Sequence, residues 1–123
     1  MASITYRTLT IEQDGSLSSS PSKMHALTGD GIVWIVDNTS NVTVKVKIKD
    51  FQKKSNGSPV SAVTFLASRA TVPANDLPGL IMGQVTFAPG GGSGSTTLTK
   101  YTIEVRSSLF DHDYDPDLEI EKP

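Results

Sequence analysis

Residues 42–49, with the sequence Val-Thr-Val-Lys-Val-Lys-Ile-Lys, decide the fold class because apolar and polar side chains alternate along them without a break. Successive side chains of a β-strand point to opposite faces of its sheet, so this period of two residues predicts a strand. One face of that strand is apolar, and the other is a row of lysines that faces water. A helix, with about 3.6 residues per turn, does not produce this pattern.

The segment just upstream, residues 32–36, is apolar at every position. A strand that is apolar on both faces is typical of the centre of a sheet covered on both sides, so we predict a central, doubly covered strand here. Residues 37–41, Asp-Asn-Thr-Ser-Asn, separate it from the alternating strand and are of the types that form turns. Residues 31–49 together therefore predict a β-hairpin.

The same period of two recurs in the rest of the chain. It predicts strands near residues 85–87, 101–105 and 117–121, with apolar positions at Val85, Phe87, Tyr101, Ile103, Val105, Leu118 and Ile120. Near the start, Ile4 and Tyr6 share one parity and Leu9 and Ile11 the other, which predicts a bulge at residues 7–8 or two short strands. Residues 60–70 leave strand and short helix open, and the Gly- and Ser-rich residues 89–95 predict a flexible connector.

Length and composition restrict the architecture further. The chain has 123 residues, no cysteine, and 11 basic against 13 acidic residues, for a net charge of −2. This length suits one domain, because two domains would each be too small to bury a good core. Many short strands with turn residues between them predict an all-β fold, a single antiparallel β-sandwich over residues 1–123.

Ser20-Pro21-Ser22-Lys23 precedes a short strand, and Gly29-Asp30-Gly31 leads into a strand that carries Trp34 and Asn38. With this order of elements, residues 20–39 resemble the first half of a cupredoxin. In the second half, residues 101–105 resemble the late strand that carries the copper-binding cysteine, and residues 117–121 the closing strand. The resemblance implies a cupredoxin-like Greek-key sandwich.

The copper ligands of that family are missing. A type 1 copper site takes two histidines, a cysteine thiolate and a weak axial ligand. Val105 stands where the resemblance places the cysteine, no histidine lies near residues 41–42, and Ser108 falls near the place of the second histidine. The expectation is therefore a sandwich without type 1 copper and without another resident cofactor.

An acidic stretch is the candidate metal site. Its carboxylates recur at every second position and are those of Asp111, Asp113, Asp115 and Asp117. Carboxylate oxygens are the ligands that calcium prefers, so calcium or another metal ion is one interpretation. The alternative is a solvated acidic loop, in which Asp115-Pro116 sets the turn before the last strand.

Two segments of opposite charge form the candidate interaction surface. Residues 42–54 hold five lysines against one aspartate, for a charge of +4, and residues 111–121 hold four aspartates and two glutamates, for −6. These segments can meet within one molecule or between neighbours, where they would set orientation more than stability. Besides the aspartates above, the predicted interaction residues are Lys45, Lys47, Lys49, Lys53, Lys54, Glu119 and Glu121.

No catalytic set is recognisable. The chain has two histidines and no Gly-x-Ser-x-Gly segment, and its acidic stretch has no aromatic platform for a sugar. We therefore predict a non-catalytic module for protein interaction or self-assembly, whose partner is another protein or a second copy. A metal-binding protein that uses loop 111–117 is the alternative, and a small enzyme of unrecognised type is the second.

The start of the chain and its charge predict where the protein is located and which partners it lacks. Residues 1–7 lack the basic start and apolar run of a secretion signal, and no apolar run approaches the roughly 18 residues of a membrane span, so we expect a cytoplasmic protein without membrane contact. Five lysines without interleaved arginines or aromatics do not favour a nucleic-acid partner.

Overall fold

The computed structural model describes residues 3–18 and 23–123, and this part of the chain contains strands and no helix. The strands are β1 (Ile4–Ile11), β2 (Met24–Leu27), β3 (Gly31–Asn38), β4 (Val44–Lys53), β5 (Val63–Ala67), β6 (Arg69–Val72), β7 (Gly79–Val85), β8 (Thr96–Arg106), β9 (Asp111–Tyr114) and β10 (Asp117–Glu121). No helix in the described residues is long and apolar enough to span a membrane. The Ser-Pro-Ser of the cupredoxin resemblance, residues 20–22, lies outside the described residues.

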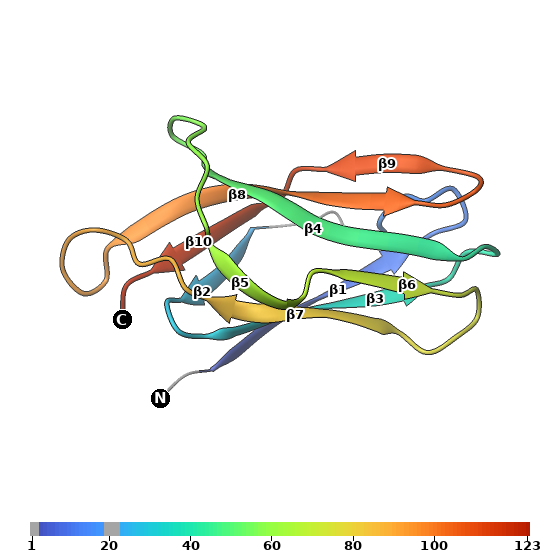
Figure 1. Ribbon diagram of the computed structural model, residues 1–123, viewed down its shortest axis with the longest axis horizontal. Helices are drawn as coiled ribbons and strands as arrows, with labels where there is room; N and C mark the ends of the chain where they lie inside the picture. Colours follow the sequence, from blue (N-terminus) through green and yellow to red (C-terminus); the bar gives the residue numbers. More distant parts are fainter. Residues whose placement is uncertain (1–2, 19–22) are drawn as a thin grey trace.

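The strands form two sheets that pack face to face (Figure 1). The four-stranded sheet has the order β1-β3-β7-β5, and the six-stranded sheet has the order β2-β10-β8-β4-β6, with β9 also paired to β8. Most neighbours are antiparallel, but one edge strand of each sheet joins in parallel: β1 to β3 and β2 to β10. The predicted all-β sandwich is thus confirmed, with two parallel pairs added at its edges.

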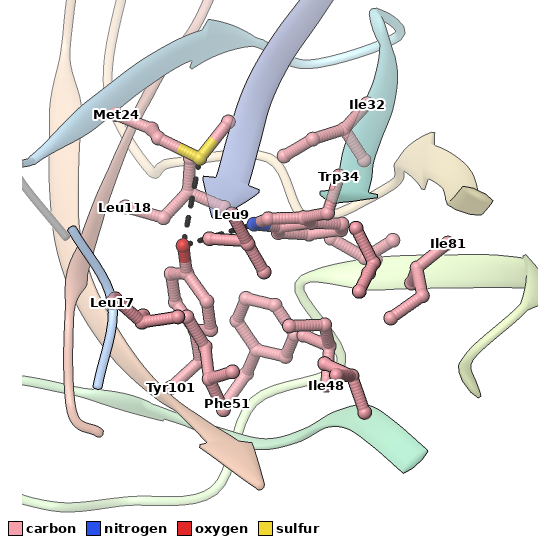
Figure 2. Packing of buried hydrophobic residues seen from close by; sticks show 14 of the residues in the cluster. Leu9, Leu17, Met24, Ile32, Trp34, Ile48, Phe51, Ile81, Tyr101 and Leu118 are labelled. Atoms are coloured by element: carbon pink, nitrogen blue, oxygen red, sulfur yellow. Dashed lines mark hydrogen bonds between the residues drawn. The ribbon is translucent and has the colours of Figure 1, made fainter. Parts of the chain in front are cut away.

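The inner faces of both sheets supply one hydrophobic core. Trp34 of β3 and Tyr101 of β8 are among its largest fully buried side chains, and Phe51 stacks on Tyr101 with ring centroids 4.9 Å apart (Figure 2). The alternation in residues 42–49 is confirmed, because Val44, Val46 and Ile48 are buried and the lysines between them face outward.

The predicted hairpin of residues 31–49 is wrong. β3 and β4 belong to different sheets, so the chain between them forms an arch across the core. The Asn38 side chain holds this arch, because Nδ2 donates to the carbonyls of Val42 (2.8 Å) and Val72 (2.9 Å). Its Oδ1 accepts from the backbone N of Ser40 at 3.0 Å. Both strands can thereby bury their apolar sides against each other instead of lying side by side.

β1 also differs from its prediction. It pairs with β3 in one unbroken register from Ile4 to Ile11, so neither a bulge at residues 7–8 nor a division into two strands occurs. The change of parity has another cause: Leu9 and Ile11 point into the core, whereas Ile4 and Tyr6 lie on the outer face and are 70% and 67% exposed.

Candidate interaction surfaces

The predicted lysine row and the predicted acidic stretch lie on either side of the same strand. β4 pairs with one edge of β8. β9 and β10 follow one another along its other edge, pairing with residues 103–106 and 96–100. Between them, the Pro116 carbonyl accepts a hydrogen bond from the Tyr101 backbone N at 3.0 Å. Segments more than 50 residues apart in sequence therefore become neighbours on the outer face of the six-stranded sheet.

Arg106 of β8 holds two of the four aspartates. Its Nη1 lies 2.6 Å from the Asp111 carboxylate, and its Nη2 lies 2.7 Å from that of Asp113. The hydrogen bond to Asp113 is the largest cause that raises the pKa of Arg106. Of the other two, Asp115 accepts a long hydrogen bond of 3.4 Å from Thr102, and Asp117 accepts one of 2.7 Å from the Lys54 ammonium.

This arrangement does not support the predicted calcium site. Along the described parts of the chain, no group of three or more acidic or histidine side chains lies close enough to hold a metal ion. Asp111, Asp113, Asp115 and Asp117 are spread along an extended strand and its continuation, and they face three different partners. A calcium ion needs six to eight oxygen atoms around one point, which an extended strand does not bring together.

Most of the other predicted interaction residues also have partners inside the chain. Lys49 forms an ion pair with Glu104. The hydrogen bond between the two side chains is the largest cause that raises the pKa of Lys49 and the largest that lowers the pKa of Glu104. The remaining contacts are Lys54–Asp117, Lys53 over the Phe87 ring at 5.8 Å, Glu119–Lys23 at 3.8 Å and Glu121–His25 at 3.0 Å.

Lys45 and Lys47 form no ion pair within the described residues, although Lys47 lies opposite Glu104 in the β-ladder. The opposite charges that the sequence separates are thus largely paired within one molecule. They give no support for charge-driven assembly between molecules.

The outer face of the four-stranded sheet is largely apolar, whereas the outer face of the six-stranded sheet carries the paired charges described above. Seven of its outward side chains are large and apolar, and we call them the outer apolar face: Ile4, Tyr6, Val33, Ile35, Leu66, Leu80 and Met82. The same side of the sheet also carries the polar Thr8, Thr64 and Gln84 and, near the end of β3, Asp37. The ladders align Tyr6, Val33 and Met82 across β1, β3 and β7, and they place Ile35 beside Leu80 in the next row. Leu66 is 82% exposed and Leu80 is 46% exposed.

This face corrects the interpretation of residues 32–36. The strand is central in its sheet, as predicted, and Ile32, Trp34 and Val36 are fully buried on its inner side. Val33 and Ile35 on the other side are only half-buried, and the described chain places no third layer over them (Figure 1). The apolar pattern correctly predicts a central strand. The described residues cover only its inner face, so the predicted cover on its outer face is absent from this part of the chain.

A shallow hollow of about 450 Å³ lies within the outer apolar face. Gly31 points outward in its row and has no side chain, so the hollow opens between Ile4, Val33, Leu66 and Met82. Its lining contains no charged residue. The surface is therefore suited to apolar side chains and not to a charged small molecule.

The histidines do not form a hydrolytic site in this structure. The His25 ring pairs with Glu121, and the His112 ring nitrogen lies 2.9 Å from the Asp14 carbonyl oxygen. Neither ring bonds to a serine hydroxyl within residues 3–18 and 23–123. A serine nucleophile needs such a base beside it, so the described residues do not present this arrangement.

Comparison with known proteins supports the fold. No protein-family model and no curated protein sequence matches the chain. Among solved structures, it is similar to a chain in the chaperone–tip adhesion subunit complex CsuC–CsuE of Acinetobacter baumannii (15% identity, TM-score 0.61, covering 80% of this chain and 47% of that chain). It is also similar to the periplasmic chaperone SfaE (6%, 0.65, 85% and 56%) and the E. coli chaperone DraB (9%, 0.59, 85% and 54%).

These similarities are structural and partial. The chain spans about half the length of each of these matched chains, and identities of 15% or less show the fold alone. They support a β-sandwich but not the cupredoxin-like assignment.

Proposed function

We propose that this chain is a non-catalytic protein-interaction module and that its binding surface is the outer apolar face. The single observation that carries the proposal is a group of large apolar side chains on the outer side of the four-stranded sheet that has no cover among the described residues. Contiguous apolar patches of this kind on soluble proteins mark interaction sites. Burying one large apolar side chain contributes about 1.5–3 kcal/mol, so a partner that covers several gains substantial binding energy.

The fold of the matched structures is consistent with this role. One of them is a chain from a pre-assembly complex of a chaperone with a tip adhesion subunit, in which two proteins are bound to each other. A more specific proposal is a chaperone-like role in subunit assembly. Only the similarity of fold supports this role. The cytoplasmic location remains a prediction, and a chaperone-like role would favour the periplasm instead.

The cupredoxin-like detail also remains a proposal. Its support is local: the Gly29-Asp30-Gly31 turn leads from β2 into β3, which carries Trp34 and Asn38 as in the quoted pattern. Val105, at the place of the copper cysteine, is fully buried in the apolar core. A copper-less module is thus the form that these residues favour.

Site-specific photo-crosslinking in living cells tests the proposed function. A photoreactive phenylalanine derivative is placed at Tyr6 or Leu80 on the outer apolar face. The matched control is Leu109, which is 72% exposed but lies between β8 and β9, away from this face. We expect discrete protein adducts from the two face positions and none from Leu109. Equal adducts at all three positions, or none at any, would contradict the proposal.

A further inference from the structure

We propose that the outer face of the six-stranded sheet carries a binding site for a phosphate group. Its ligands are Lys45 and Lys47 of β4 and Arg69 of β6, which we call the cationic cluster. The site lies on the other sheet from the outer apolar face, so the inference goes beyond the proposed function and does not depend on it. It is carried by the charges that the ladder brings together, by the carboxylates around them and by a hollow between them.

The β-ladder places like charges directly opposite each other. Lys47 of β4 pairs with Arg69 of β6, and Lys45 pairs with Arg106 of β8. Side chains directly opposite each other have Cβ atoms about 5 Å apart, and like charges in this position destabilise a sheet. Lys45 and Arg69 are diagonal neighbours, about 7–8 Å apart. The long side chains of the cationic cluster can therefore reach one common point.

The carboxylates beside the cationic cluster are held by other cations. Glu104 is the carboxylate that lines this part of the sheet, and it pairs with Lys49 and with Arg106, whose Nη2 lies 3.6 Å from it. Asp111 and Asp113 also pair with Arg106. Within residues 3–18 and 23–123, the cationic cluster forms no ion pair and no side-chain hydrogen bond. An anion from outside the chain would offset the repulsion that these residues leave in place.

A hollow of about 350 Å³ lies between the members of the cationic cluster. Besides these three side chains, its polar lining consists of Thr71, Glu104 and Arg106. This volume lies at the lower end of the range of small-molecule pockets. The cluster also occupies only two rows of the ladder, so it suits one compact anion and not the long backbone of a nucleic acid.

A phosphate group matches this cluster better than a carboxylate does. A phosphate monoester carries about −1.5 to −2 charges at neutral pH and offers three acceptor oxygens. The guanidinium of Arg69 presents parallel N–H donors that fit two of these oxygens, and each lysine adds a mobile positive charge. The three cations can thus contact three oxygens at once, whereas one carboxylate offers only two.

Titration with inorganic phosphate, followed by the amide chemical shifts in NMR spectra, tests the inference. We expect saturable shifts in β4 and β6 around the cationic cluster, and none with sodium chloride at the same ionic strength. Lys47→Gln and Arg69→Gln should each raise the dissociation constant for phosphate roughly fivefold or more. Lys100→Gln is the matched control, because it removes the same charge from β8 of the same sheet, outside the cluster, and should bind as the wild type does.

Thermal melting provides a second readout and shows that each variant is folded. Phosphate should raise the melting temperature of the wild type and of Lys100→Gln, but not that of Lys47→Gln or Arg69→Gln. In low salt without phosphate, these last two variants should melt at or above the wild-type temperature, because each removes one member of a like-charge pair.

A third titration, with glycerol phosphate, identifies the source of the phosphate group. Binding at least as tight as that of inorganic phosphate supports a phosphorylated ligand, and weaker binding supports free phosphate. The absence of saturable shifts with both compounds would overturn the inference. So would equal shifts with chloride, which indicate charge screening only, or an equal loss of affinity in Lys100→Gln and the cluster variants.

Discussion

The indole nitrogen of Trp34 donates a hydrogen bond of 3.1 Å to the hydroxyl oxygen of Tyr101, and this bond joins the two sheets through the middle of the core (Figure 2). Trp34 lies on β3 of the four-stranded sheet and Tyr101 on β8 of the six-stranded sheet. The tyrosine hydroxyl in turn points at the Met24 sulfur, 3.5 Å away. The only tryptophan of the chain thus has its single polar atom satisfied by a residue 67 positions later.

Removing that hydroxyl should weaken the fold without changing it. Tyr101→Phe leaves the buried Trp34 N–H without an acceptor, and an unsatisfied buried donor costs about 1–3 kcal/mol. We expect the free energy of unfolding in urea to fall by that amount. Tyr6→Phe is the matched control, since Tyr6 is 67% exposed, and it should change stability by less than about 0.5 kcal/mol. Equal effects of the two substitutions would contradict the role of the buried bond.

Alkaline pH should destabilise the protein through the same tyrosine. Burial is the largest cause that raises the pKa of Tyr101, from 10.0 to about 12. Between these values the unfolded chain binds fewer protons than the native one, so the free energy of unfolding falls as the pH rises. The stabilisation is complete below about pH 10 and is lost as the pH passes about 12, for a total of roughly 2–3 kcal/mol.

Urea unfolding at several pH values between about 9 and 12 measures this loss. Tyr101→Phe is the control, because it lacks the titrating group and should show a shallower fall. Tyr114, whose pKa is also raised by burial, contributes in the same direction to both proteins and cancels in the comparison. Parallel curves for the two proteins would count against the assignment to Tyr101.

The arch between β3 and β4 should depend on one amide. Asn38→Ala leaves the Val72 carbonyl without this donor, leaves the Val42 carbonyl with only the 3.1 Å bond from the Ser40 hydroxyl, and removes the acceptor of the Ser40 backbone N. We expect a loss of about 2–4 kcal/mol in the free energy of unfolding, because these groups are buried or partly buried. Asn41→Ala, at an exposed position in the same arch, should cost less than about 0.5 kcal/mol. A mild effect at Asn38 would show that the arch is held by other contacts.

Calcium should not bind the acidic stretch. Asp111 and Asp113 already pair with Arg106, and Asp117 pairs with Lys54, so a calcium ion would have to displace three contacts to reach carboxylates that do not converge. We expect titration calorimetry to show no saturable heat, and calcium to leave the melting temperature of the wild type and of Asp113→Asn unchanged. A saturable signal that Asp113→Asn removes would restore the metal interpretation.

Several features of the fold were predictable because they depend only on the pattern of side chains within short segments. The alternation of Val44, Val46 and Ile48 with lysines correctly identified both the strand and its buried face. Leu118 and Ile120 did the same for β10. The hairpin prediction was wrong because two adjacent apolar strands can pair side by side or face each other across a core. The contacts of Asn38 with Val42 and Val72, which select the arch, join residues up to 34 positions apart.

The sequence contains the residues of the candidate surface, but their pattern alone does not identify it. The parity of Ile4 and Tyr6 predicts a bulge or two short strands, and the apolar pattern of residues 32–36 predicts a strand covered on both faces. Only the pairing of β1 with β3 and of β3 with β7 shows that Tyr6, Val33 and Met82 form one row on an uncovered face. A sequence pattern reports that a face is apolar, but it does not report what covers it.

The segments of opposite charge show the same contrast between what the sequence determines and what the tertiary structure decides. By itself the sequence determined that this chain forms strands, which side chains of β4, β8 and β10 enter a core, and that a lysine segment and an acidic segment exist. These properties follow from the two-residue repeat of an extended backbone, which acts within a few residues. The tertiary structure alone decided that most of those charges find partners within the molecule, mainly Glu104 and Arg106 of β8, and that the apolar face remains open. Both outcomes depend on which distant strands become neighbours, and that is set by packing the whole chain at once.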